Sequence, residues 1–170
     1  MSLIRDERPE DAEAVRAILV AAFGRGAEAR LVERLRASGK IVCALVADEK
    51  GRVLGHMVLS RIAVESGGSE IPVLALAPLA VMPAFQRLGI GSALVSAGLE
   101  RCRTAQHARV MVLGDPAYYG RFGFVSASRF GLKCPFPAAE EGFMAIELDP
   151  GAFAQVSGVV RYGHEFDDLE

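Results

Sequence analysis

The chain has 170 residues, of which 51% are hydrophobic, and its 19 basic and 21 acidic residues leave a net charge of −2. This length and composition predict one compact domain over residues 1–170 and exclude a disordered chain. Lysine and arginine form no run, so we expect no nucleic-acid partner.

The terminal sequence and the cysteines bear on the compartment. The N-terminal residues 1–8 carry acidic side chains and lack the apolar core of a signal peptide, and no apolar stretch is long enough to span a bilayer. Cys43, Cys102 and Cys134 are widely spaced and form neither a Cys-x-x-Cys pair nor a zinc set. We therefore expect a cytoplasmic protein with no membrane partner and no metal.

The first half of the chain alternates between helical and extended patterns. Apolar residues recur at helical spacing and then give way to β-branched runs broken by turn residues. The predicted elements are a helix from about Pro9 to Gly24, a helix over 28–36, an antiparallel hairpin of 41–47 and 53–64, and a strand over 71–81. The last of these strands is apolar almost throughout, so helices should cover both faces of the sheet.

The apolar strand continues into a glycine-bearing turn, a helix over 89–106 and a short strand over 109–113. Strand, helix and strand in this order predict two parallel neighbouring strands. Pro78 cannot donate to a sheet ladder, so the strand should part from a neighbour there and leave the main chain of Leu79 and Val81 to an outside partner. The start of the following helix is a natural anion site, and a connection without any ligand is the alternative.

The rest of the chain is richer in turn residues. The pattern predicts a short helix over 116–122, a long loop over 130–142, a strand over 143–148 and a last edge element over 156–162.

Two motifs, in this order, resemble the GNAT superfamily of N-acetyltransferases. Gln86-x-x-Gly89-x-Gly91 resembles its acetyl-CoA motif, and residues 118–124 (YYGRFGF) resemble its second signature, a short helix with a tyrosine before Gly-Phe. The stretch 114–124 is similar to a bacterial subgroup of these proteins, with the motif DPxYYxxFGF. The resemblance covers residues 3 to about 148 and implies an α/β (α+β) GNAT fold, with a mixed, strongly twisted sheet of about six to seven strands, helices on both faces and a splayed βαβ cofactor wedge.

The resemblance also implies an activity, the transfer of an acetyl group from acetyl-CoA to an amine of a small molecule or peptide, without a metal. It implies that the Val81 N–H polarises the acetyl carbonyl and that Tyr119 protonates the departing CoA thiolate, with Tyr118 as the alternative acid. The residues it implies for acetyl-CoA binding are Leu79, Ala80, Val81, Gln86, Arg87, Leu88, Gly89, Ile90, Gly91 and Ser92.

The general base, the role of Asp115 and the function itself each have more than one interpretation. The general base is unassigned among Glu65, His56, Glu70 and a water relay, and Asp115 is expected to cap the short helix, with contact to the substrate amine as the alternative. A non-catalytic sensor or structural module that binds acyl-CoA is the alternative function, and a homodimer is left open. Gly91 is followed by Ser92 rather than lysine, so the turn lacks the lysine that a Walker loop requires.

Overall fold

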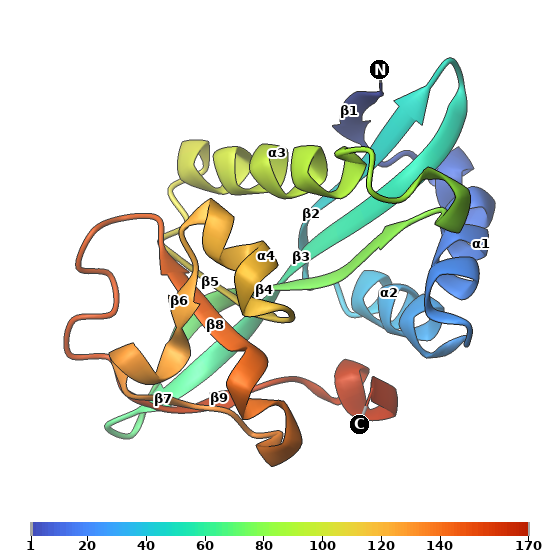
Figure 1. Cartoon of the computed structure of the whole chain (residues 1–170). Coiled ribbons are helices and arrows are strands. Elements are labelled where there is room, and N and C mark those ends of the chain that lie inside the picture. The colour runs from blue at the N-terminus through green and yellow to red at the C-terminus, as the bar shows by residue number, and fades with distance from the viewer. Residues whose placement is uncertain (1, 170) are drawn as a thin grey trace. The chain divides into compact units, whose positions relative to one another are not determined.

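The computed structural model describes residues 2–169, and Figure 1 gives the element labels used below. These residues form two compact units, each assembled from separate stretches of the chain. The first unit contains residues 2–60, Ala77–Glu100 and Leu169, and the second contains Arg61–Leu76 and Arg101–Asp168. Strands β3 (Arg52–Ser66) and β4 (Ser69–Val81) contribute to both units. The single domain over 1–170 stays a prediction, and its end residues, Met1 and Glu170, lie outside the described residues.

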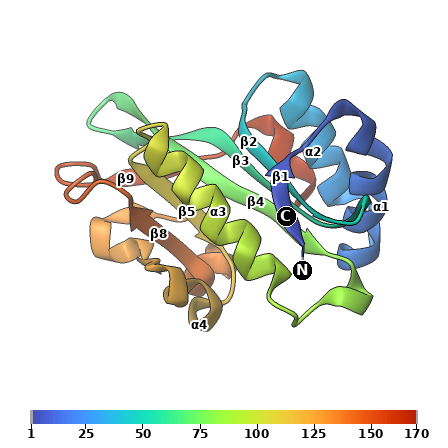
Figure 2. The same ribbon diagram turned by 90° about the horizontal axis from the view of Figure 1, so that it is seen from above.

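The first unit joins a small antiparallel sheet to helices. Strand β1 pairs with β2, β2 pairs with β3, and β4 follows β3 in the sheet order. The elements besides β3 and β4 are β1 (Leu3–Asp6), α1 (Ala12–Phe23), α2 (Ala27–Ala37), β2 (Ile41–Glu49) and most of α3 (Ile90–Thr104). Figures 1 and 2 show α3 on one face of these strands and α1 with α2 on the other. The helices and the hairpin predicted in this part of the chain are confirmed.

A glycine in β3 brings the start of α3 close to the sheet. A Cβ at Gly55 would lie 3.0 Å from side-chain atoms of both Ile90 and Leu94, which belong to the first turns of α3. Any larger side chain would therefore push the helix start away from the strand. The position of this helix start matters because the predicted anion site lies there.

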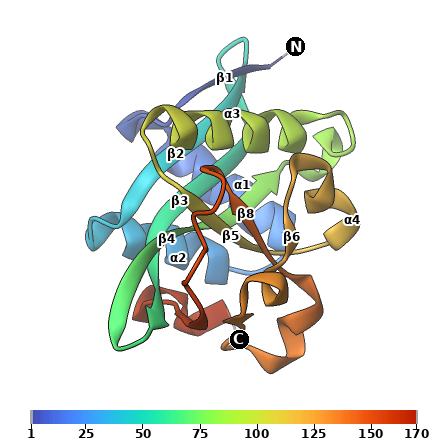
Figure 3. The same ribbon diagram turned by 90° about the vertical axis from the view of Figure 1, so that its left-hand side faces the viewer.

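The second unit carries the remaining strands. Its sheet order is β3-β4-β5-β8-β6, and β9 pairs with both β3 and β7. The additional elements are β5 (Arg109–Leu113), α4 (Pro116–Tyr119), β6 (Val125–Ser126), β7 (Leu132–Lys133), β8 (Phe143–Glu147) and β9 (Gly158–Arg161). Figure 3 shows β5, β8 and β6 side by side. Strands β4 and β5 are parallel, as predicted, and their ladder comprises Leu74 opposite Val110 and Ala75 opposite Met111, before Pro78.

Two sequence-based expectations for this unit are wrong. The segment 130–142 is not one long loop, because it contains β7 and a short 3₁₀ helix, Pro137–Gly142. The segment 156–162 is not an edge element, because β9 has a neighbour on each side. With β6 and β7 the described residues hold nine strands rather than six or seven. Two-residue strands form only through distant partners, so a local pattern does not reveal them.

No helix within residues 2–169 combines the length and hydrophobicity that crossing a membrane requires.

Candidate active site

The end of β4 presents main-chain groups at the strand edge that faces away from β3. The Met82 N–H donates to the Leu54 C=O of β3 at 2.9 Å. Because successive residues of a strand direct their main-chain groups to opposite edges, the Val81 N–H and C=O point to the other edge. The sequence predicts that an outside partner binds at this edge, since Pro78 interrupts the strand. The main-chain direction of Val81 agrees with that prediction.

The turn between β4 and α3 has the backbone of an anion-binding turn. Arg87 and Gly89 both have left-handed backbones, with φ of 64° and 88°. The Gly89 C=O accepts the N–H of Ala93 at 3.0 Å, so Gly89 caps the helix and Ile90 begins it. Left-handed residues in a turn fold successive N–H groups around a concave space, and the positive end of the helix dipole adds to them.

The turn has room for a ligand as well as donors for one. A Cβ built on Gly89 would meet nothing within 4 Å, so its surroundings are open. Leu88, the residue between the two left-handed positions, is 70% exposed. An open, donor-rich helix start fits a diphosphate group, whose oxygens only accept hydrogen bonds and carry negative charge.

Gln86 connects this turn to the end of the strand. Its side-chain Nε2 donates to the Val81 C=O at 3.0 Å. The resemblance assigns Gln86 to acetyl-CoA binding, and in the structure its side chain holds the turn against the strand. This bond spans five residues and depends on the 3₁₀ turn Pro83–Phe85, so no sequence pattern indicates it.

Tyr119 belongs to the second unit, at the end of α4. Its side chain is 9% exposed and contacts the rings of Tyr118 and Phe124 edge-on, with centroids 5.0 and 5.8 Å away. Burial, with a smaller contribution from Tyr118, raises the pKa of Tyr119 to about 12. The phenol is therefore protonated at neutral pH and can donate a proton.

The start of α4 has the cap that the sequence predicts. The Asp115 carboxylate accepts the N–H of Ala117 at 3.0 Å, and Pro116 occupies the first helical position. Asp115 thus has a structural role in fixing the helix. Tyr118, the alternative acid, is half-buried and lies beneath the guanidinium of Arg121, 4.7 Å from its ring centroid.

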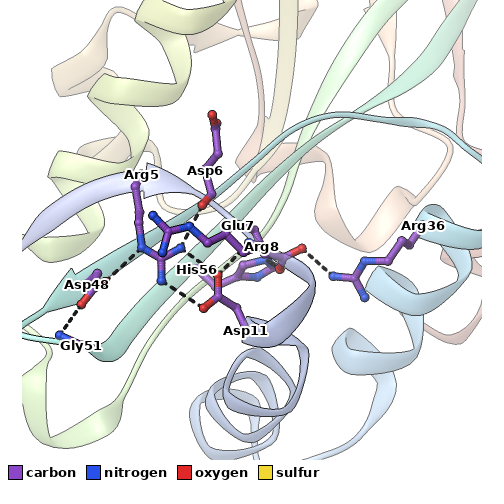
Figure 4. Close-up of polar contacts among 9 residues, drawn as sticks. All are labelled: Arg5, Asp6, Glu7, Arg8, Asp11, Arg36, Asp48, Gly51 and His56. Atoms are coloured by element: carbon purple, nitrogen blue, oxygen red, sulfur yellow. Dashed lines mark hydrogen bonds and ion pairs between the residues drawn. The ribbon is translucent and has the colours of Figure 1, made fainter.

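The three side chains considered as general base have different surroundings. His56 is fully buried, and its Nε2 lies 2.8 Å from Oε1 of Glu7, as Figure 4 illustrates. Glu65 pairs with Arg161 at 2.6 Å and is half exposed, and Glu70 is exposed. A fully buried histidine that already faces a carboxylate is not available to an acceptor amine, so His56 belongs to the structural core.

Glu7 is the centre of a charge cluster that joins β1, β3 and α2. Its Oε2 accepts from Nη2 of Arg36 at 2.7 Å, while Oε1 faces His56. Burial by itself would raise the pKa of Glu7, but the hydrogen bonds from His56 and Arg36 outweigh burial and lower it. Folding therefore favours the ionised form of Glu7.

This cluster predicts how stability changes with pH. A carboxylate whose pKa is lowered on folding stabilises the fold above its unfolded pKa, near 4.5, and loses that contribution as pH falls through the folded value. We expect Glu7→Gln to lower the free energy of unfolding by about 1–3 kcal/mol at pH 7. Below pH 4.5 the difference should shrink.

Urea denaturation at pH 7 and at pH 4 measures both values, with Glu13→Gln on the exposed side of α1 as the control. Glu13 lies in the first turn of α1, where its charge stabilises the helix by about 0.3–1 kcal/mol, so we expect the control to lower stability at pH 7 less than Glu7→Gln does. A Glu7→Gln effect of the same size at pH 4 as at pH 7 would contradict the role given to the charge.

Within residues 2–169, no group of three or more His, Cys, Asp or Glu side chains could hold a metal ion.

Comparison with known proteins gives a family for most of the chain. Residues 3–127 match the model of a family described as acetyltransferase (GNAT) domain. A protein of Escherichia coli strain K12, named uncharacterized N-acetyltransferase YhbS, is 38% identical over 166 residues, which is 97% of this chain and 98% of that protein.

Two solved structures have the same fold over nearly the full length. The GNAT family N-acetyltransferase YhbS from Escherichia coli, in complex with CoA, has 38% identity and a TM-score of 0.91, covering 98% of this chain and 92% of that one. A GNAT family acetyltransferase from Brucella melitensis, in complex with acetyl-CoA, has 34% identity and a TM-score of 0.82, covering 98% and 99%. The predicted mixed α/β fold, with a sheet flanked by helices, is confirmed.

Proposed function

We propose, from the premise that this chain belongs to the GNAT family of acetyltransferases, that it moves an acetyl group from acetyl-CoA to an amine by direct attack of the amine nitrogen. The observation that carries the proposal is the turn after β4, with its left-handed Arg87 and Gly89 at the start of α3. The YhbS structure contains CoA and the Brucella melitensis structure contains acetyl-CoA, and both support the same ligand here.

The cosubstrate supplies an activated acetyl group as a thioester. In our proposal the diphosphate lies on the turn, where backbone N–H groups and the helix dipole offset its charge. The strand residues before the turn would bind the pantetheine arm through their main chain. The full proposed set is Leu79, Ala80, Val81, Gln86, Arg87, Leu88, Gly89, Ile90, Gly91 and Ser92.

The Val81 N–H is the proposed donor to the acetyl carbonyl oxygen. Its direction, away from β3, supports this role, because a donor used in the sheet would not be open to a ligand. A fixed donor of this kind stabilises the negative charge that develops on the oxygen during attack, and one such donor contributes about 2.7–4 kcal/mol in a studied hydrolase. Gln86 supports the donor by holding the neighbouring C=O of the same residue.

Tyr119 is the proposed general acid. A pKa of about 12 keeps the phenol protonated at neutral pH, so that it can give its proton to the departing thiolate. In this proposal the acceptor is a small-molecule or peptide amine, the general base is unassigned, and one cytoplasmic domain spans residues 1–170.

Measuring free CoA thiol tests the proposal. The purified protein is incubated with acetyl-CoA and, in turn, a diamine, an aromatic amine, an amino acid and a peptide with a free N-terminus. We expect one class to raise thiol release above the rate without amine, with acetylated amine formed in equal amount. Binding of acetyl-CoA without thiol release for any class would instead support the non-catalytic acyl-CoA-binding module.

A further inference from the structure

The ring of Tyr119 packs against Gly114, a residue without a side chain. A Cβ built on Gly114 would lie 2.9 Å from Cδ2 of Tyr119, closer still to Cε2, and 3.4 Å from Cζ, the carbon that carries the phenol oxygen. Real Cβ atoms essentially never approach other heavy atoms within 3.0 Å. The ring of Tyr119 and a side chain at position 114 therefore exclude each other.

The other contacts of the ring limit where it could move. Tyr118 and Phe124 touch it edge-on, and its side chain is almost fully buried. Closely packed rings leave no empty volume on these two sides. A methyl group at position 114 would therefore have to turn or shift the phenol.

A second glycine fixes the backbone on which the ring lies. The Gly114 N–H donates to the Gly142 C=O at 3.0 Å, joining the end of β5 to the start of β8. A Cβ at Gly142 would lie 2.5 Å from the Gly114 carbonyl oxygen. Neither glycine has a left-handed backbone, so close approach, rather than conformational freedom, accounts for the lack of a side chain at both positions.

We propose that Gly114, held by Gly142, is a positioning residue that sets the Tyr119 phenol in place for proton transfer. The inference rests on the proposed acid role of Tyr119. It adds that Gly114, because it has no side chain, leaves the space that the Tyr119 ring occupies. Even an added methyl group at position 114 would misplace the phenol that donates the proton.

The test compares Gly114→Ala with Gly120→Ala. Gly120 lies next to Tyr119 in the chain, has a helical φ of −57°, and a Cβ there would meet nothing within 4 Å. We expect Gly114→Ala to lower kcat about 100-fold, the scale of a misplacement of about 1 Å, with the KM for acetyl-CoA unchanged. Gly120→Ala should keep the wild-type kcat.

A measurement without any substrate separates positioning from a general loss of structure. Burial raises the pKa of Tyr119 to about 12, so a displaced, more exposed ring should titrate closer to the ordinary value of about 10. Carbon NMR of Cζ-labelled tyrosine, assigned with Tyr119→Phe, follows this titration. We expect the Tyr119 signal to titrate at lower pH in Gly114→Ala and at the wild-type pH in Gly120→Ala.

A double variant decides whether Gly114 acts through Tyr119. In a Tyr119→Phe background the phenol is already absent, so adding Gly114→Ala should lower kcat little further. A loss as large as in the wild-type background would overturn the inference, as would an unshifted Tyr119 titration. If Tyr119→Phe leaves kcat unchanged, the proposed acid role of Tyr119 is wrong. If Tyr119→Phe lowers kcat but Gly114→Ala keeps the wild-type kcat, only the positioning role of Gly114 is wrong.

A third variant covers the case in which Gly114→Ala does not fold. Phe124→Leu shortens a side chain that packs edge-on against the Tyr119 ring, so Gly114→Ala/Phe124→Leu gives the displaced ring more space. The same lower kcat and lower-pH titration are expected relative to Phe124→Leu alone. Equal values in the two proteins would overturn the inference.

Discussion

Tyr119→Phe is expected to lower kcat by about 10²- to 10⁴-fold, the usual contribution of a general acid or base. The substitution removes the phenol oxygen and keeps the ring, so the packing against Tyr118 and Phe124 is preserved. The KM for acetyl-CoA should stay near the wild-type value, because the residues proposed to bind it are elsewhere in the chain. Steady-state thiol release at saturating amine measures both constants.

Tyr118→Phe is the matched control, since it removes the neighbouring phenol and should leave kcat close to the wild-type value. The pH profile adds a second check. Because the pKa of Tyr119 is raised to about 12, its deprotonation should not lower kcat anywhere between pH 7 and 10. Equal losses in the two variants, or a larger loss in Tyr118→Phe, would transfer the acid role away from Tyr119.

Gly89→Val is expected to weaken acetyl-CoA binding and leave the chemistry intact. Gly89 has φ of 88°, a conformation that a β-branched residue adopts only under strain. The strain of about 1–3 kcal/mol favours a different turn, in which the N–H groups no longer converge. If that energy appears in binding, the dissociation constant rises by about 5- to 150-fold.

Gly39→Val controls for strain without a ligand. Gly39 follows α2, has φ of 70°, and a Cβ there would meet nothing within 4 Å. Both substitutions should cost folding stability by the same mechanism, which thermal unfolding measures. Only Gly89→Val should change the affinity for acetyl-CoA, and a similar loss of affinity in Gly39→Val would remove the turn from the binding site.

Periodicity was enough to predict the elements that bury a continuous apolar face. The helices α1, α2 and α3 and the parallel pairing of β4 with β5 follow from apolar spacing and from the strand-helix-strand order. Strands β6 and β7 were missed because each has two residues and depends on a partner far along the chain. Their formation is set by tertiary contacts, to which local propensity contributes little.

The features of the candidate site also fall into two groups, those that a local sequence pattern predicts and those that depend on the fold. The glycine-bearing turn, the Asp115 cap and the tyrosine pair are carried by neighbouring residues, so motifs reveal them. The bond from Gln86 to the Val81 carbonyl and the packing of Tyr119 on Gly114 depend on how the chain turns back on itself. In the sequence, Gly114 cannot be told apart from any other glycine that follows a strand.

Calorimetric titration of acetyl-CoA into the wild type, Gly89→Val and Tyr119→Phe tests most directly the central claim, that the turn, and not Tyr119, binds the cosubstrate. The account predicts that Tyr119→Phe binds acetyl-CoA as tightly as the wild type and that Gly89→Val binds it at least fivefold more weakly, by the strain estimate of about 1 kcal/mol or more. Wild-type affinity in Gly89→Val, or weakened binding in Tyr119→Phe, would contradict it.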